Sequence, residues 1–336
     1  MEITPPYLLF LGDVKDNLAA KTGLGIVDWR PEWCVGQLRL EGCNADAGID
    51  DLSIDNAVAK GAKTFVIGCV NAGGMLPDHW VETIVAAVEA GMDVASGLHS
   101  RLEEFPAIKE AAERNGVKLI NVRHSDQKFA TGKGSKRSGK RLLAVGTDCS
   151  VGKKYTALAM DKGMRERGFN ATFAPTGQTG VFISGRGISL DAVIADFISG
   201  AAEWLTPDAD ENHWHVVEGQ GSLFHPSFAG VTLGLLHGSQ PDAFIVCHEP
   251  TRTNMRGVQT PLPTIQQVID LTIANGKLTN PDIRCVGISV NTTALEDAEA
   301  RAYLQGLSEE YQLPATDPVR YGVAPIVDKL VEVYGV

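Results

Sequence analysis

The chain has 336 residues, 44% hydrophobic and 7% aromatic, and its 30 basic and 41 acidic residues give a formal net charge of −11. This composition is typical of a globular protein of about two domains, and the acidic balance argues against a nucleic-acid partner. No apolar run approaches the roughly 18 residues of a membrane helix, and the 6 cysteines lack the spacing of a zinc site, so we expect a reduced, cytoplasmic protein with no signal peptide, membrane partner or metal.

Short apolar runs alternate with helical patterns in residues 1–123, and this alternation favours a parallel sheet flanked by helices. Strands are expected at residues 7–11, 64–69, 93–95 and 117–122. One helix is expected at 78–90, with Asp78 as its N-cap and Gly91 as its stop, and a second at 107–115. Residues 1–123 are therefore predicted to form one α/β domain.

Residues 124–141 contain six Lys or Arg, three Gly and almost nothing apolar. A solvated basic linker is the favoured interpretation of this composition. The alternative is a basic flap beside an anionic ligand, because the segment leads directly into the next predicted strand.

The alternation of strands and helices resumes at residue 142. Strands are expected at residues 142–145, 171–174, 215–217, 243–247 and 286–290, and helices at 153–167, 189–204, 264–274, 296–311 and 324–333. Residues 142–336 are predicted to form a second α/β domain. The predicted fold class is therefore α/β, with two domains that each contain a mainly parallel sheet flanked by helices.

The most informative segment is the turn Gly146-Thr-Asp-Cys-Ser-Val-Gly-Lys-Lys-Tyr-Thr156, which lies between a predicted strand and a predicted helix. Backbone N–H groups in such a turn, the helix N-terminus and a lysine together bind phosphate. A glycine turn without a ligand is the competing interpretation. The residues assigned to the phosphate ligand are Gly146, Thr147, Cys149, Ser150, Val151, Gly152, Lys153, Lys154, Tyr155 and Thr156.

This turn departs twice from the usual phosphate-loop pattern. Thr147 occupies the first glycine position, and Lys154 stands where a serine or threonine would bind Mg²⁺, so that the nearest hydroxyl beyond Lys153 belongs to Thr156. The loss of that hydroxyl weakens Mg²⁺ coordination, whereas Lys154 could contact a second phosphate. The loop therefore fits a pyrophosphate-containing cofactor at least as well as it fits an ATPase.

Other polar side chains follow predicted strands of the second domain, at the sheet edge where ligands bind in parallel sheets. Glu218 is a candidate metal ligand or general base, or else a cap of the next segment. Arg252 is a candidate partner for a substrate carboxylate, or else part of a surface salt bridge. No set of nucleophile and base follows from the spacing, and Cys149 is interpreted as a packing residue. The remaining candidates for substrate contacts are Arg186, Gln178, Gln220 and His225.

The phosphate loop, together with Val217-Glu218-Gly219, resembles the dethiobiotin synthetase branch of P-loop proteins, from which Lys154 departs. A resemblance to the D-glutamate N-acetyltransferase family, long catalogued as a domain of unknown function, covers nearly the whole chain. Its architecture is a Rossmann-like domain followed by a P-loop domain. The matching segments are Lys21-Thr22, the turn at residues 68–74, residues 91–99, the phosphate loop, residues 218–222, His248-Glu-Pro-Thr-Arg252 and residues 316–322.

The resemblance implies transfer of an acetyl group from acetyl-CoA to the amine of D-glutamate, in D-amino-acid catabolism. On this interpretation the loop binds the CoA phosphates, Glu218 or Asp148 removes a proton from the substrate ammonium, and Arg252 with Arg186 holds a substrate carboxylate. Neither Mg²⁺ nor ATP is required, and the expected partners are the amino-acid substrate and further copies of the chain in a homo-oligomer. Two alternatives are an ATP- or GTP-dependent ligase or kinase of the dethiobiotin synthetase type, and a nucleotide-binding regulatory module.

Overall fold

The structure, a computed structural model, describes residues 2–70, 74–124 and 127–335. The chain divides into two compact units, Met1–Lys128 with Gly177–Ala192, and Phe129–Thr176 with Val193–Val336. Each unit is built on one sheet of parallel strands, which confirms the predicted fold class. Residues 177–192, which the sequence assigns to the second domain, pack with the first unit. Parts of the predicted turn at 68–74 and of the predicted linker lie outside the described residues.

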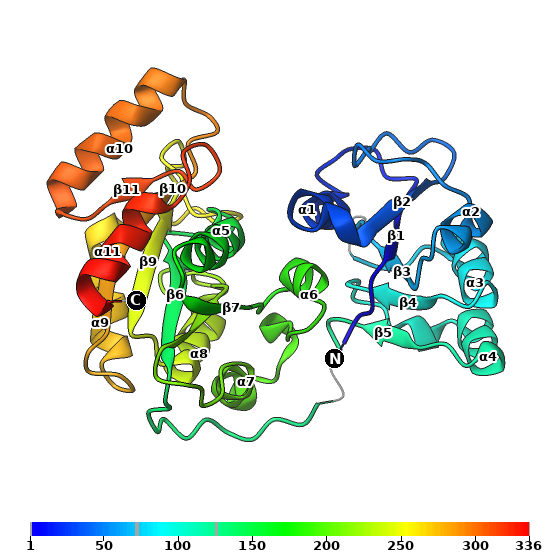
Figure 1. Ribbon diagram of the computed structural model, residues 1–336, viewed down its shortest axis with the longest axis horizontal. Coiled ribbons are helices and arrows are strands. Elements are labelled where there is room, and N and C mark those ends of the chain that lie inside the picture. Colours follow the sequence, from blue (N-terminus) through cyan, green and yellow to red (C-terminus); the bar gives the residue numbers. More distant parts are fainter. Residues whose placement is uncertain (1, 71–73, 125–126, 336) are drawn as a thin grey trace. The chain divides into compact units, whose positions relative to one another are not determined.

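The first unit has a five-stranded sheet in the order β2-β1-β3-β4-β5 (Figure 1). All four predicted strands are confirmed, whereas β2, α1, α2 and α6 were not predicted. The strands are β1 (Tyr7–Gly12), β2 (Cys34–Arg39), β3 (Thr64–Ile67), β4 (Asp93–Ser96) and β5 (Leu119–Asn121). The α-helices are α1 (Lys21–Trp29), α2 (Ile54–Ala59), α3 (Val81–Glu89), α4 (Pro106–Asn115) and α6 (Gln178–Ser184).

The predicted helix at 78–90 starts differently from the expectation. Its first turn, Asp78–Trp80, is a 3-10 turn, the α-helix begins at Val81, and Asp78 makes no capping bond, so its assignment as the N-cap is wrong. The buried Trp80 ring packs 5.2 Å from that of Phe10, and its indole N–H donates to Asp13 at 2.9 Å. The anchored indole therefore sets the geometry of this turn, in place of a side-chain cap.

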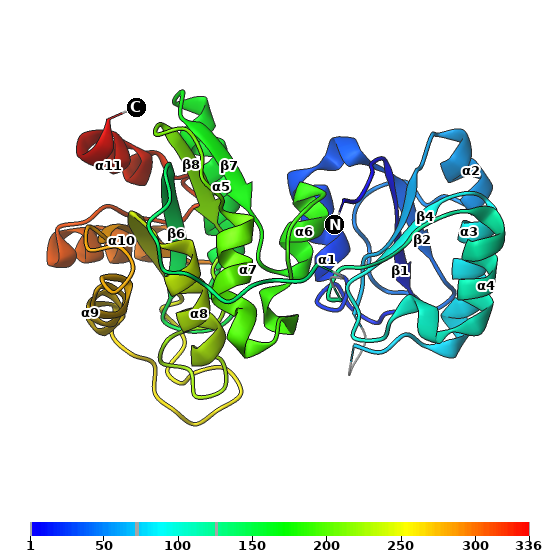
Figure 2. The same ribbon diagram turned by 90° about the horizontal axis from the view of Figure 1, so that it is seen from below.

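The second unit has a six-stranded sheet in the order β11-β10-β9-β6-β8-β7. Helices α5 and α11 lie on one face of this sheet, and α8 and α9 lie on the other (Figure 2). The strands are β6 (Lys140–Gly146), β7 (Asn170–Ala174), β8 (His213–Val217), β9 (Ala243–His248), β10 (Arg284–Val290) and β11 (Ala315–Thr316). The helices are α5 (Lys153–Glu166), α7 (Ile198–Leu205), α8 (Ala229–Ser239), α9 (Ile265–Gly276), α10 (Asp297–Tyr311) and α11 (Ala324–Tyr334).

The predicted helix at 189–204 is wrong over its first half. Two 3-10 turns, Leu190–Ala192 and Ala195–Phe197, precede α7. The chain passes from the first unit to the second between these turns, after Ala192, and this crossing interrupts the helix. None of the helices in the described part of the chain combines the length and hydropathy that a bilayer crossing demands.

The basic segment before β6 is anchored rather than fully solvated. The Arg141 side chain is buried and donates to the carbonyl oxygens of Arg137, Gly139, Thr206 and Pro207. Arg137 donates to the hydroxyl of Thr206 and to the carbonyl oxygen of Gly238. These two cations are thus committed to structure, so neither serves as part of a basic flap.

The same cluster makes the stability of the second unit sensitive to acid. Burial, with the neighbouring His213 and the guanidinium of Arg141, lowers the pKa of His215 to about 4. An unfolded histidine titrates near 6.5, so the native state binds fewer protons than the unfolded state between pH 6.5 and 4. The contribution of neutral His215 is therefore complete above pH 6.5 and is lost as the pH falls toward 4.

We expect the free energy of unfolding to fall by about 1–2 kcal/mol more in the wild type than in His215→Gln between pH 7.5 and pH 5. The glutamine amide can still donate to the Pro207 carbonyl oxygen, which accepts from His215 at 3.2 Å, but it does not titrate. Urea unfolding at the two pH values measures the difference. Equal losses in the two proteins would show that His215 is not the acid-sensitive group.

Candidate functional site

The phosphate loop connects β6, a central strand, to α5. Because β6 lies between β9 and β8 in a parallel sheet, the segments that follow these three strands meet at one edge. The loop has a tight backbone: Ser150 and Gly152 have positive φ angles of 55° and 104°. A Cβ on Gly146 would lie 2.8 Å from the Cγ2 of Val151, so the turn closes on a residue without a side chain. This is the strand, turn and helix context that a phosphate loop requires.

Lys153 begins α5 and points back into the loop. Its ammonium donates to the carbonyl oxygen of Asp148 at 2.6 Å, and the residue is 7% exposed. Burial lowers the pKa of this lysine. A Cβ on Gly219 would lie 2.9 Å from Lys153 Cδ and 1.6 Å from the carbonyl oxygen of Ala144. Gly219 therefore allows the turn after β8 to pack directly against the lysine stem.

Glu218 lies next to this contact, at the carboxyl end of β8. It is 4% exposed, and its Oε2 accepts from the backbone N–H of Thr176 at 3.0 Å. The Thr176 hydroxyl donates to the Glu218 carbonyl oxygen at 2.6 Å and accepts from the amide of Gln220 at 3.1 Å. Thr176, which follows β7, thus holds both the carboxylate and the backbone carbonyl of Glu218 beside the phosphate loop, where the carboxylate can bind a cation or accept a proton.

Asp148, the second carboxylate of the site, is fully buried and heavily engaged. Its Oδ2 accepts from Arg252 at 2.6 Å and from the backbone N–H of Arg256 at 2.7 Å, and its Oδ1 accepts from the N–H of Cys149 at 2.6 Å. Arg252 also donates to the carbonyl oxygen of Cys149 at 2.7 Å. The guanidinium of Arg252 and two backbone N–H groups thus occupy both oxygens of Asp148.

Asp148, Cys149 and His225 bring one potential metal-ligand atom each within 4.8 Å of one another. His225 is buried, its Nε2 lies 3.0 Å from the carbonyl oxygen of Arg256, and its Nδ1 accepts from the N–H of Ser227 at 3.1 Å. Both ring nitrogens therefore have backbone partners, and Asp148 already faces a cation. The donor set fits a structural hydrogen-bond network better than a divalent metal.

The hydroxyl nearest to the Mg²⁺ position is used within the unit. Thr156 Oγ1 donates to the carbonyl oxygen of Gly152 at 3.0 Å and lies 2.7 Å from Ser289 Oγ. The ammonium of Lys154 lies 4.6 Å from the centre of the Tyr155 ring. The loop thus presents ammonium groups, rather than a hydroxyl, after its last glycine.

The structure separates the predicted substrate residues into two groups. Gln220, His225 and Arg252 belong to the second unit, with the phosphate loop, whereas Gln178 and Arg186 belong to the first. Gln178 Oε1 accepts from Arg123 at 3.0 Å, and Arg186 is exposed. Their roles in substrate binding stay predictions.

Two residues of the site, Thr176 and Arg256, are not among the residues that the sequence assigned to it. Thr176 follows β7 and holds Glu218, and its place directly after an apolar strand was a usable signal. Arg256 follows Arg252 by four residues and contacts the same loop. A second arginine at that spacing after a strand end was the signal for it.

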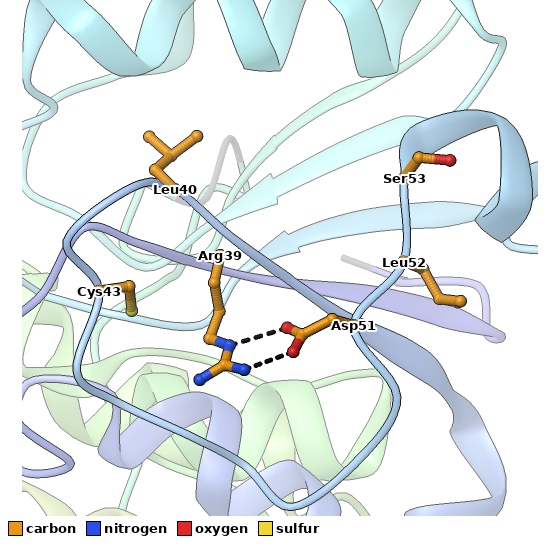
Figure 3. Close-up of a pocket in the computed structure, with 6 residues that line it drawn as sticks. All are labelled: Arg39, Leu40, Cys43, Asp51, Leu52 and Ser53. Carbon is orange, nitrogen blue, oxygen red and sulfur yellow. Dashed lines mark hydrogen bonds and ion pairs between the residues drawn. The ribbon is translucent and has the colours of Figure 1, made fainter.

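A pocket in the first unit is lined by Arg39, Leu40, Cys43, Asp51, Leu52 and Ser53, none of which is a predicted site residue. Figure 3 shows the guanidinium of Arg39, at the end of β2, bonded directly to the carboxylate of Asp51 in the lining of this pocket. Arg39 also donates to the carbonyl oxygen of Ala45 at 3.3 Å and lies 3.5 Å from Asp46. These contacts tie the loop after β2 to the strand, so we assign the arginine a structural role.

Comparisons with known proteins place the chain in a family. Residues 128–327 match the DUF1611 P-loop domain, and residues 38–125 match the DUF1611_N Rossmann-like domain, both described as domains of unknown function. A crystal structure of a DUF1611 family protein from Anabaena variabilis is 28% identical, covers 98% of this chain and 100% of that one, and superposes with a TM-score of 0.85.

Two curated relatives carry a name. A D-glutamate N-acetyltransferase from Pseudoalteromonas is 51% identical over 331 residues, and one from Tritonibacter scottomollicae is 52% identical over 332. Each match covers 98% of this chain and 100% of the relative. These matches confirm the resemblance found in the sequence: the chain belongs to the DUF1611 family of Rossmann-like and P-loop proteins, together with these two D-glutamate N-acetyltransferases.

Proposed function

We propose that the protein transfers the acetyl group of acetyl-CoA to the amine of D-glutamate. The observation that carries this proposal is the full-length match, at 51% and 52% identity, to two proteins named for that activity. The chain is accordingly an enzyme of the acyltransferase class. Such an enzyme must bind the phosphates of its acyl carrier, and the phosphate loop is proposed as that binding site.

The loop is proposed to bind phosphates of CoA rather than the γ-phosphate of a nucleotide. Its backbone turn, the N-terminus of α5 and the ammonium of Lys153 suit an anion. The Thr156 hydroxyl, which would be the nearest Mg²⁺ ligand, already bonds to Gly152 and Ser289. Acetyl transfer needs no Mg²⁺ and no ATP on this mechanism, because the thioester is already activated.

Glu218 is the proposed general base. It takes a proton from the substrate ammonium, and the freed amine attacks the thioester carbonyl carbon. The C–N bond forms first and gives a tetrahedral intermediate. The C–S bond then breaks as the second proton of the nitrogen passes to the leaving sulfur, so that CoA leaves as the thiol, and Glu218 returns its proton to solvent. Backbone N–H groups of a glycine turn stabilise the oxyanion of the tetrahedral intermediate.

Contacts to the amino-acid substrate are proposed for Gln220 and Arg252, at the same sheet edge as the loop. The side-chain amide of Gln220 donates a hydrogen bond to the Thr176 hydroxyl at 3.1 Å, which orients this side chain. One terminal nitrogen of Arg252 donates to Asp148 and to the carbonyl oxygen of Cys149, and the other lies 3.4 Å from the carbonyl oxygen of Ser150. That second nitrogen is the part of the guanidinium proposed for a substrate carboxylate.

The test is release of free thiol from acetyl-CoA with D-glutamate, with L-glutamate and with no acceptor, each with and without ATP and Mg²⁺. We expect release that depends on D-glutamate and is indifferent to ATP. Mg²⁺-dependent ATP hydrolysis without thiol release would return the chain to the ligase or kinase class. Tight nucleotide binding without any turnover would instead support a regulatory module.

Cys149 is expected to take no covalent part in transfer, although it lies near His225 and Asp148. Burial raises the pKa of its thiol, which disfavours the nucleophilic thiolate, and both nitrogens of His225 have other partners. We expect Cys149→Ala to keep kcat within about threefold of the wild type, whereas loss of a nucleophile costs on the order of 10⁴-fold or more. A loss of that larger size, or a trapped acetyl-cysteine in the wild type, would contradict the direct-transfer mechanism.

A further inference from the structure

A short loop between β9 and α9 presents two arginines to the phosphate loop. We name residues 249–262, which carry Arg252 and Arg256, the arginine loop. Arg256 reaches the phosphate loop twice, through its backbone N–H to Asp148 Oδ2 at 2.7 Å and through its guanidinium to Ser150 Oγ at 2.6 Å. The side chain therefore lies beside Ser150 of the phosphate loop.

The arginine loop is ordered by its own contacts. The N–H of the buried Met255 donates to the carbonyl oxygen of Thr260 at 2.8 Å, and the N–H of Leu262 donates to the carbonyl oxygen of Thr253 at 3.0 Å. Residues Asn254 and Pro261 form an antiparallel bridge. Arg256 thus follows the buried Met255 in a turn closed by backbone hydrogen bonds. The backbone position of Arg256 is therefore set before any ligand binds.

The two arginines differ in charge balance. Arg252 lies between two carboxylates, 2.6 Å from Asp148 and 3.5 Å from Glu249. Arg256 is exposed, and among residues 2–70, 74–124 and 127–335 no carboxylate lies within ion-pair distance of its guanidinium. Within the described residues its guanidinium donates to the neutral hydroxyl of Ser150. Arg256 therefore places a positive charge that is not balanced by a carboxylate beside Ser150 of the phosphate loop.

We propose that Arg256 and Ser150 form a second anion subsite, which binds a phosphate monoester of the ligand whose other phosphates occupy the loop. The inference rests on the proposed function, on which the ligand is acetyl-CoA and the monoester is its 3′-phosphate. The loop cradles one end of the pyrophosphate, and CoA carries a third phosphate group that needs a cation of its own. A guanidinium suits a phosphate because two parallel N–H donors match two of its oxygens.

The experiment crosses two ligands with two proteins. Dissociation constants of CoA and 3′-dephospho-CoA are measured by titration calorimetry for the wild type and for Arg256→Gln, at one salt concentration. We expect the wild type to bind CoA about 10- to 100-fold more tightly than dephospho-CoA, as for hydrogen bonds to charged groups. In Arg256→Gln this preference should fall to within about threefold, with dephospho-CoA binding unchanged.

Two further variants separate charge from fold. Arg256→Lys keeps the charge but loses the paired donors, and should retain an intermediate preference for CoA. Lys277→Gln removes one positive charge from an exposed position of the same unit and should keep the full preference. Equal weakening of both ligands by Arg256→Gln would overturn the subsite, as would an unchanged preference or a rise confined to the KM for D-glutamate.

The two proposals fail in distinguishable ways. Binding of CoA with the expected preference, but without acetyl transfer to D-glutamate, would support the subsite and overturn the proposed reaction. Acetyl transfer with equal KM values for acetyl-CoA and its dephospho analogue would support the reaction and overturn the subsite. If wild-type protein does not bind CoA, the subsite is overturned together with the role of the loop.

Discussion

Replacing Lys153 by methionine is expected to raise the KM for acetyl-CoA by about 10- to 100-fold, the range for hydrogen bonds to charged groups. Methionine keeps an unbranched stem to fill the space beside Gly219, where a Cβ would already meet Lys153 Cδ at 2.9 Å. Only the ammonium is removed, together with its bond to the carbonyl oxygen of Asp148. The loss therefore reports a contact to the ligand.

The fold should tolerate this substitution well. Burial already lowers the pKa of Lys153, so the folded protein bears a cost for keeping that ammonium charged. We expect the free energy of unfolding of Lys153→Met to equal or exceed that of the wild type. The matched control is Lys162→Met, an exposed lysine of the same helix, which should change neither KM nor stability. An unchanged KM in Lys153→Met would remove the phosphate loop from CoA binding.

Much of the fold was predictable because its strands are buried on both faces. Residues 7–11 of β1 and 243–247 of β9 form continuous apolar runs, which are typical of strands buried on both faces and lack the polar spacing of an amphipathic helix. β2 was missed because Gly36 and Gln37 interrupt its apolar pattern, although both are buried. Gly36 is required there, since a Cβ would lie 2.6 Å from the carbonyl oxygen of Asp50, a contact between segments that local pattern does not reveal.

The candidate site was predictable in its parts but not in its pairings. The spacing of residues 146–153 identified the phosphate loop, because the same backbone turn and lysine recur wherever this chemistry is used. That Arg252 pairs with Asp148 depends on two loops about a hundred residues apart in sequence meeting at one sheet edge. The order of the strands decides which loops meet, and local sequence does not state that order.

Replacing Glu218 by glutamine is expected to lower kcat by about 10²- to 10⁴-fold, the usual contribution of a general base. The glutamine Oε1 can still accept from the N–H of Thr176, as Oε2 of Glu218 does at 3.0 Å, so the turn beside the loop is preserved. We expect the dissociation constant for CoA to change by less than about threefold, because the carboxylate has no role in binding phosphate.

Asp148→Asn provides the opposite comparison and decides between the two carboxylates. The substitution removes the negative charge of the carboxylate whose Oδ2 accepts from Arg252 at 2.6 Å and from the Arg256 N–H at 2.7 Å. Because these contacts hold the arginine loop against the phosphate loop, we expect weaker CoA binding and a kcat near that of the wild type. Calorimetry for CoA and steady-state thiol release separate the two effects. A large loss of kcat in Asp148→Asn, with near-normal kcat in Glu218→Gln, would make Asp148 the base. The arginine loop would then have to leave Asp148 in every turnover, because the guanidinium of Arg252 and the N–H of Arg256 both bond to Oδ2 of this carboxylate.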